Sequence, residues 1–289
     1  MRIAAVRVAG RDAVGVVEGD SLAVIAEGPV GPSLLELIEG GATKNDWCAR
    51  VAQAPRIRLN TVQWLPPVVS PYASVLCVGK NYYAHAREFF GSGFDSTSRD
   101  EIPTEPVIFA KTGSCVVGHG ATVFASLDPT GSTDYEGELA VVIGRTAHNI
   151  TRAGAWDVIF GYTICNDVTS RELQKRHSQW LIGKSLDSFG PLGPWIVTAD
   201  EVGDITAQTL VTTVNGEERQ RAAISDLIFD IPRLIETLTA TMTLQPGDII
   251  ATGTPAGVGI GHKPPRYLKP GDRMEVSISG IGTLANTVA

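Results

Sequence analysis

The sequence predicts an α+β protein that is mostly β with a few helices, in which a small N-terminal β-rich domain precedes a larger one. Glycine supplies 31 of the 289 residues, above its usual share of about 7%, and this indicates many tight turns. Short apolar runs rich in β-branched residues recur between glycines and prolines, which is typical of strands. An extended run at 62–71 carries three prolines and is predicted to be a linker. We therefore expect one domain over 1–70 and a second over 71–289.

Composition limits the classes of function. The chain has 289 residues, of which 43% are apolar, and this is enough to bury a large core. A net charge of −7 and a pI near 5.3 offer no basic face for phosphates, so no nucleic-acid partner is expected. No apolar run approaches the length of a membrane span or forms the core of a signal peptide. We therefore expect no membrane partner. The four cysteines lack a C-x-x-C pair and are predicted to be buried reduced thiols, which favours a cytoplasmic protein.

The N-terminal region is predicted to consist of hairpins and one helix. Strands are expected at 3–8, 15–17 and 22–25, separated by glycine-containing turns. A serine followed by apolar residues at helical spacing and a glycine predicts a short helix over 33–40. No pattern here carries a chemical signature, so the expected role is packing or oligomerisation.

A possible catalytic base follows the first strand of the second domain. Residues 74–79 predict a buried strand, and the pattern after them becomes helical. His85 and Glu88 are three residues apart, which places them side by side on a helix. A carboxylate beside an imidazole fixes its tautomer and raises its basicity, as a general base requires, although an ordinary surface pair is the alternative. Residues 90–106 lack periodicity and are predicted to form a lid over a cleft.

The central stretch is 134–144, which follows strands expected at 106–111 and 115–118. Residues 139–143 predict a buried strand that Gly144 closes. Because side chains alternate along a strand, Asp134, Glu136 and Glu138 are expected on one face. Burying ionised acids is costly, and a hard divalent cation would compensate for that cost. The alternative is that the two glutamates are solvated at a strand end.

A metal site needs a third oxygen ligand, and Asp167 is the candidate. A short helix is expected over 153–157, followed by a strand at 159–165 that leads directly into Asn166 and Asp167. A second acid at a strand end, close after the first pair, suits a metal ligand. The alternative is that Asp167 caps a helix over 168–174, a position that aspartate favours.

Two later loops carry possible substrate-binding groups. Lys184 lies in a loop over 183–194 that glycines and prolines punctuate; it could present a cation to an anionic substrate or enolate, although such lysines are usually solvated. The loop at 252–259 is not a dinucleotide fingerprint, because His262 occupies the position that would complete one from Gly257. Its amides and the Thr254 hydroxyl could instead hold a carboxylate. The other elements expected are strands at 195–197, 210–214 and 248–251, a helix at 231–238, and a hairpin in 270–282.

Six motifs, taken in order, resemble the fumarylacetoacetate hydrolase family over roughly residues 72–289. They are G-K-N-Y-x-x-H-A-x-E (79–88), D-Y-E-G-E-L-A-V-V-I-G (134–144), N-D-V-T-S-R-E-L-Q (166–174), G-K-S-L-D-S-F-G-P-L-G-P (183–194), T-G-T-P-A-G-V-G (252–259) and G-I-G-T-L-x-N-T-V (280–288). The resemblance implies a mostly β, mixed-sheet catalytic domain, a homodimer and a Mg²⁺ or Mn²⁺ site.

The resemblance also implies roles for particular residues. The metal would be bound by Glu136, Glu138 and Asp167. Water would be activated by a dyad on a closing lid, His85 and Glu88. The oxo-acid substrate would be bound by Lys184, Thr254, Gly253 and Tyr82.

The family acts on 2-oxo or 2,4-dioxo acids that chelate the metal. The expected activity is metal-dependent hydrolysis of a C–C bond in acylpyruvates, with the distal carbonyl attacked by activated water. An oxaloacetate-type decarboxylase or a 2-hydroxy-diene-dioate isomerase of aromatic catabolism is an alternative, because these reactions share an enolate. A non-catalytic metal or oxo-acid binding protein is another. A glycosidase with Glu136 and Glu138 as its acids would leave Asp167 without a role. Residues 90–106 would shape the distal pocket, so the resemblance does not fix the substrate.

Overall fold

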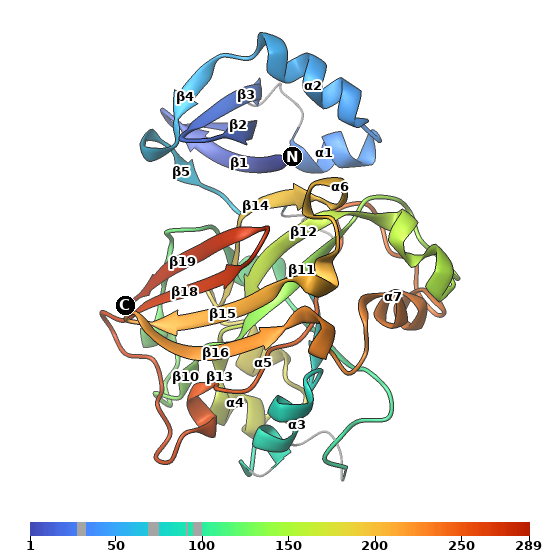
Figure 1. Cartoon of the computed structure of the whole chain (residues 1–289). Coiled ribbons are helices and arrows are strands. Elements are labelled where there is room, and N and C mark those ends of the chain that lie inside the picture. The colour runs from blue at the N-terminus through green and yellow to red at the C-terminus, as the bar shows by residue number, and fades with distance from the viewer. Residues whose placement is uncertain (28–32, 69–74, 91, 95–99) are drawn as a thin grey trace.

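The computed structural model describes the chain except for residues 28–32, 69–74, 91 and 95–99. Most of its strands belong to one 12-stranded mixed sheet (Figure 1), which confirms the predicted α+β, mostly β class. These strands are β1 (Arg2–Val8), β2 (Arg11–Glu18), β3 (Ser21–Glu27), β4 (Arg56–Arg58), β5 (Gln63–Trp64), β6 (Val75–Gly79), β7 (Val107–Lys111), β8 (Val116–Val117), β11 (Gly137–Ile143), β12 (Ile159–Asn166), β14 (Gly190–Thr198) and β17 (Ile249–Ala251). The order along the sheet is β4-β3-β2-β1-β14-β12-β11-β17-β6-β7, with β5 beside β1 and β8 beside β14.

A second sheet covers one face of the first. Its order is β16 (Glu217–Ala223), β15 (Thr209–Val214), β18 (Arg273–Ile278), β19 (Gly282–Val288) and β9 (Thr122–Val123). Apolar side chains from both sheets share one core, among them Leu139 and Val141 of β11 and Leu210, Val276 and Leu284 of the second sheet. A separate two-stranded ladder joins β10 (Thr133–Asp134) to β13 (Thr169–Ser170). All seven residues of β11 are buried, so the strand that carries the predicted acids lies at the centre of the molecule.

The helices are short. They are α1 (Leu34–Glu39), α2 (Lys44–Gln53), α3 (Tyr83–Phe90), α4 (Arg171–Arg176), α5 (Leu181–Lys184), α6 (Ala199–Val202) and α7 (Ile231–Thr239) among the described residues. Of these, α1, α2 and α7 bury apolar residues against the sheets. Short 3₁₀ turns are η1 (Leu59–Thr61), η2 (Gly113–Cys115), η3 (Ala125–Leu127), η4 (Arg152–Val158), η5 (Ile205–Ala207), η6 (Ile224–Asp226) and η7 (Gly259–Gly261). None of these described helices is long and apolar enough to cross a lipid bilayer.

The N-terminal strands continue the main sheet. β1 pairs antiparallel with β14, with Arg2 opposite Val197 and Ile3 opposite Ile196. One apolar cluster also crosses this junction and contains Ile3 together with Ala140 of β11. In Figure 1 the N-terminal strands and helices form the upper part of the molecule, directly above β14. The boundary predicted near residue 70 falls within 69–74, outside the described residues.

Helix prediction succeeded where a cap and an apolar stripe coincide. At α1, the Ser33 hydroxyl accepts from the Glu36 N–H while the Glu36 carboxylate accepts from the Ser33 N–H, so the predicted helix and its cap are confirmed. The sequence analysis missed α2, although Thr43 and Asp46 form the same reciprocal cap.

Several other predictions need correction. The helix expected over 153–157 is the 3₁₀ turn η4. The helix expected over 168–174 starts only at Arg171, because the two residues before it pair with β10. The strand expected at 195–197 begins at Gly190, and the polar strand β16 was not predicted. All four cysteines are free, but Cys48 is exposed rather than buried.

Candidate active site

Antiparallel pairing of β11 with β12 brings the three predicted metal ligands together. Glu136 immediately precedes β11, Glu138 is its second residue, and Asp167 follows the end of β12. Gly137 is opposite Asn166, and the Asp167 N–H donates to the Glu136 carbonyl at 2.8 Å. One carboxylate oxygen from each acid lies within 4.8 Å of the others, and all three side chains are buried. The alternative of solvated glutamates is therefore wrong.

Two buried lysines contact this acid triad. Lys184, at the end of α5, places Nζ 2.8 Å from Glu136 Oε2 and 2.7 Å from Asp167 Oδ2. Lys111, at the end of β7, places Nζ 2.7 Å from Asp167 Oδ1 and also donates to the carbonyls of Val168 and Lys184. Asp167 therefore binds lysines rather than capping α4, whose N-cap residue is Ser170. The sequence analysis did not identify Lys111.

Arg171 extends the charge network on the other side of Glu136. Its Nη1 lies 2.6 Å from Glu136 Oε1, and its Nε donates to Asp134 Oδ2 at 2.8 Å. Arg171 is fully buried and lines a pocket beside the triad, and its Nη2 has no hydrogen-bond partner among the described residues. Asp134 and Glu136 thus contact the same guanidinium, which agrees with the expectation that they project from one face.

The three acids differ in their electrostatic environments. Burial opposes ionisation of Glu136, but Lys184 and Arg171 outweigh it and hold its pKa at about 2. Burial, together with Asp167 and Glu136, raises the pKa of Glu138 well above its usual range. Within the described part of the chain, no lysine or arginine nitrogen lies within ion-pair distance of Glu138, which accepts the Gly253 N–H at 2.9 Å. Three clustered carboxylates, one of which has no ion-pair partner among the described residues, fit a hard divalent cation.

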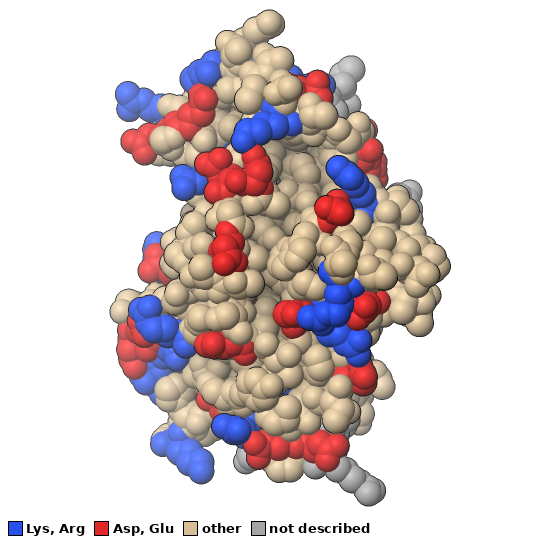
Figure 2. Space-filling view, turned by 45° about the vertical axis from the view of Figure 1, so that its right-hand side comes forward, with Lys and Arg blue, Asp and Glu red and all other residues tan. Residues whose placement is uncertain are grey.

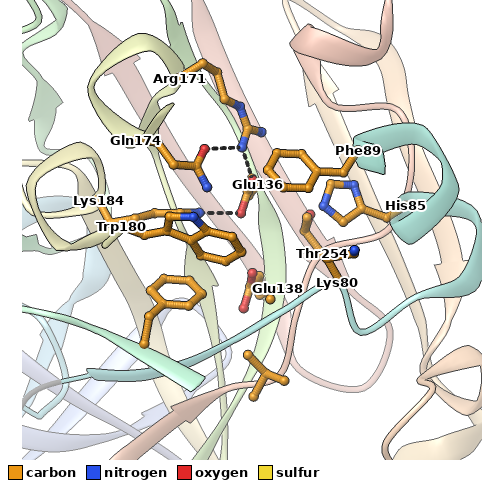
Figure 3. Close-up of a pocket in the computed structure, with 13 residues that line it drawn as sticks. Lys80, His85, Phe89, Glu136, Glu138, Arg171, Gln174, Trp180, Lys184 and Thr254 are labelled. Atoms are coloured by element: carbon orange, nitrogen blue, oxygen red, sulfur yellow. Dashed lines mark hydrogen bonds and ion pairs between the residues drawn. The ribbon is translucent and has the colours of Figure 1, made fainter. Parts of the chain in front are cut away.

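The predicted dyad forms on α3. His85 Nδ1 lies 3.3 Å from Glu88 Oε2, and the Gly257 N–H donates to Glu88 Oε1 and Oε2 at 3.1 and 3.2 Å. His85 is buried and stacks on Phe89 with 5.9 Å between ring centroids, so it is not half of an ordinary surface pair. Because Glu88 lies at Nδ1, the other ring nitrogen, Nε2, is the one available for proton transfer. Figure 3 shows His85 approaching Glu136 from the side opposite Lys184.

The four predicted substrate contacts occupy different positions. Lys184 and Thr254 line the pocket, but the Thr254 hydroxyl already donates to the Gly137 carbonyl at 3.0 Å. Gly253 and Tyr82 are not among the pocket-lining residues. Gly253 donates to Glu138, while Tyr82 lies in an apolar core and its hydroxyl has no hydrogen-bond partner among the described residues. Substrate contact by these four residues remains a prediction.

Charged and aromatic side chains are interspersed around the pocket (Figure 3), with Lys184 over the Phe109 ring and Arg171 over the Phe89 ring. It has room for about one water molecule and is lined by Val78, Gly79, Lys80, His85, Phe89, Phe109, Glu136, Glu138, Arg171, Gln174, Trp180, Lys184 and Thr254. No role was predicted for Lys80, Arg171, Gln174 or the aromatic residues. The spacing of Arg171 and Gln174 was a usable signal, because residues three apart share a helix face. The expected lid at 90–106 is only partly described, since residues 91 and 95–99 lie outside the described residues.

Comparison with known proteins agrees with this fold. Residues 74–289 match the family model described as fumarylacetoacetate (FAA) hydrolase C-terminal. The chain therefore belongs to the fumarylacetoacetate hydrolase family.

Three relatives indicate how varied the family is. Oxaloacetate tautomerase YisK of Bacillus subtilis (strain 168) is 47% identical over 230 residues, which cover 80% of this chain and 74% of that protein. A fumarylacetoacetate hydrolase structure from psychrophilic Exiguobacterium antarcticum has a TM-score of 0.85 at 40% identity, covering 100% of this chain and 99% of that one. Maleylpyruvate hydrolase from Sphingobium sp. SYK-6, solved with manganese(II) and pyruvate, has a TM-score of 0.80 at 32% identity with the same coverage.

Proposed function

We propose that this protein is a Mg²⁺- or Mn²⁺-dependent enzyme that interconverts the keto and enol forms of a small 2-oxo acid of the oxaloacetate type. The observation that carries the proposal is that a buried histidine base, Lys184 and two acids of the buried triad, Glu136 and Glu138, line one small pocket. The relative at 47% identity is named an oxaloacetate tautomerase, which supports this choice of reaction.

The metal would be held by Glu136, Glu138 and Asp167. A bound Mg²⁺ or Mn²⁺ would polarise the 2-oxo carbonyl and so acidify the neighbouring C–H group. Glu138 supports this assignment, because its carboxylate is buried and repelled by the other two acids. The manganese(II) ion in the Sphingobium structure supports the choice of metals.

The chain's own residues would carry the proton. His85 Nε2 would take a proton from the carbon next to the carbonyl, or return it in the reverse direction. Glu88 would keep the neutral ring protonated at Nδ1 and would stabilise the imidazolium that forms. Two of the three Lys184 N–H donors contact Glu136 and Asp167, so the third could donate to the oxygen on which charge develops.

Hydrolysis of acylpyruvates is the second candidate. The same dyad could activate a water molecule, and one hydrolase of the family was solved with pyruvate. Decarboxylation of oxaloacetate and isomerisation of a hydroxy-diene-dioate would use the same polarised carbonyl. A non-catalytic oxo-acid binding protein would bind the same ligands without consuming them. We place keto–enol interconversion first because the relative at 47% identity is named an oxaloacetate tautomerase.

A single assay separates these reactions. Enol oxaloacetate and acetylpyruvate are followed by absorbance with Mg²⁺ or Mn²⁺ and then with excess chelator, while CO₂, pyruvate and acetate are quantified. We expect metal-dependent acceleration of enol decay without CO₂, and a loss of about 100-fold or more in His85→Ala. CO₂ with pyruvate would indicate a decarboxylase, and acetate with pyruvate a hydrolase. Tight binding without turnover would indicate a binding protein, and full activity in Glu136→Gln would contradict the metal site.

We also propose that the protein is a cytoplasmic homodimer. The four free cysteines support a reducing compartment. The dimer rests on the family resemblance, and light scattering on the purified protein would test it.

A further inference from the structure

A short glycine loop, residues 257–261, lies between β17 and β18 and contacts the carboxylate of Glu88. The Gly257 N–H contacts both oxygens of Glu88. A Cβ atom built at Gly261 would lie 1.9 Å from Glu88 Oε1, so no side chain fits there without moving the glutamate. The position of Glu88, and through it that of His85, therefore depends on where the glycine loop sits.

The glycine loop is fastened by Asp134, a residue that the proposed function does not use. Asp134 is fully buried and does not line the pocket. Its Oδ1 accepts from the N–H groups of Tyr135 at 2.9 Å and Gly259 at 2.7 Å. Its Oδ2 accepts from the Ile260 N–H at 3.0 Å and from Arg171 Nε at 2.8 Å. Each oxygen thus has two donors, which fills the acceptor capacity of the carboxylate.

Asp134 also reaches the acid triad through a different partner. Arg171, which it holds by Nε, contacts Glu136 through Nη1 at 2.6 Å. A continuous series of contacts therefore joins Glu136 to Arg171, Asp134, the glycine loop and Glu88. The two halves of the site come from different elements, β11 and α3, and one carboxylate lies between them.

We propose that Asp134 is a positioning residue that docks the glycine loop and thereby holds Glu88 against His85, while it orients Arg171 against Glu136. The proposal rests on the proposed function only for the role of His85 as the base. A neutral amide at this position would turn an N–H toward some of the four donors. The contacts to the glycine loop and to Arg171 would therefore both weaken, although the side chain keeps its shape.

The test uses Asp134→Asn with Asp128→Asn as its matched control. Asp128 is likewise a buried aspartate, and its oxygens accept from the Thr130 and Ser132 N–H groups and the Ser170 hydroxyl. None of these bonds involves the glycine loop, Arg171 or Glu88. The control therefore reports the general cost of neutralising a buried, fully bonded aspartate.

The first readout needs no activity. Hydrogen exchange of residues 257–260 and the imidazole nitrogen signals of His85, assigned by their loss in His85→Ala, are compared in the three proteins. We expect faster exchange in the loop and a changed His85 signal in Asp134→Asn, with neither change in Asp128→Asn. An unchanged loop, an unchanged His85 signal, or equal changes in both variants would overturn the proposal.

The second readout is a double-mutant cycle with Glu88→Gln. We expect Asp134→Asn to lower kcat by about 10–100-fold with a much smaller change in KM. Because it acts through Glu88, the double variant should lose less than the product of the single losses, by about fivefold or more. In the Asp128→Asn cycle, the loss of kcat in the double variant should equal the product of the two single losses. The same result for Asp134→Asn would overturn the proposal.

Two complications remain distinguishable. Should Asp134→Asn not fold, Gly259→Ala perturbs the same contact from the loop, because its Cβ would lie 2.5 Å from Asp134 Oδ1 and 2.5 Å from the Arg266 carbonyl oxygen. The same exchange and His85 measurements then decide the matter. Should the wild-type protein turn over no oxo acid, the proposed function fails, while the activity-free readout still shows whether Asp134 positions Glu88 and His85.

Discussion

The N-terminal strands and the acid cluster use ion pairs of the same geometry in opposite environments. Arg7 and Asp12 approach to 2.6 Å with side chains 43% and 60% exposed, whereas Lys184 and Asp167 approach to 2.7 Å at 1% and 0%. In Figure 2, acidic and basic side chains are interspersed over the face shown, and neither sign forms one large patch. Exposed pairs of this kind contribute little to stability, because water screens them. Buried pairs cost desolvation, so the acid cluster is better explained by function than by stability.

The largest expected effect comes from removing the N-terminal strands. A chain of residues 65–289 would leave the edge of β14 unpaired and would expose the apolar residues that face Ile3 and Val14. We expect this fragment to aggregate or to show no cooperative thermal transition by calorimetry. A monodisperse, active fragment would instead show that the catalytic region folds independently, with its boundary near residue 70.

Lysine replacements test the difference between buried and exposed pairs directly. Lys111→Met removes a buried partner of Asp167, and we expect the free energy of unfolding to fall by about 3 kcal/mol in urea titrations. Lys44→Met removes an exposed partner of Asp200 and should leave the curve unchanged. Equal effects from the two variants would contradict the contrast between the regions.

Metal binding should appear as stability without any assay of turnover. At a Mg²⁺ or Mn²⁺ concentration about 100 times Kd, the wild-type Tm should rise by about 4 °C, because the ion binds only the folded triad. Glu138→Gln removes one ligand and should show almost no shift, whereas Asp128→Asn should retain it. A full shift in Glu138→Gln would show that the ion binds elsewhere.

The smallest expected effect concerns thiols. Cys48 is exposed, whereas Cys77, Cys115 and Cys165 are buried, and burial raises the pKa of all three. An aromatic disulfide reagent should therefore titrate one thiol in the folded protein and four after denaturation. Cys48→Ser should abolish the rapid reaction, and a second fast thiol would show that the catalytic region opens as easily as the N-terminal surface.

Sequence alone predicted most of the fold and the central acids, for physical reasons. β11 and α1 combine local propensity with a clear boundary, and Glu136, Glu138 and Asp167 stand at strand ends where periodicity places them together. Partners brought in by tertiary contact were not predictable in the same way. Lys111 ends an unremarkable strand, and only the folded chain brings it to Asp167.

Long-range neighbours were not predictable, because a local pattern does not specify them. Alternation along a strand placed Asp134 on the face of the glutamates, and Arg171 does contact both Asp134 and Glu136, but it could not name Arg171 or Gly259 as partners. Cys48 was predicted to be buried from its residue type, yet it lies on the outer side of α2, a helix that had not been predicted.

The burial of β11 has a consequence for the order of events in the site. We expect a strand buried along its whole length to exchange its amides only on global unfolding, and α3, which has exposed residues along one side, to open at a lower free-energy cost. The acids at the start of β11 would then keep their arrangement while the helix bearing the base detaches and returns. We expect a protein in this partly opened state to retain its cation and to capture an oxo acid, but to transfer no proton until α3 redocks. Substrate capture by the acids beside β11 and proton transfer by the base on α3 would thus be separate kinetic stages.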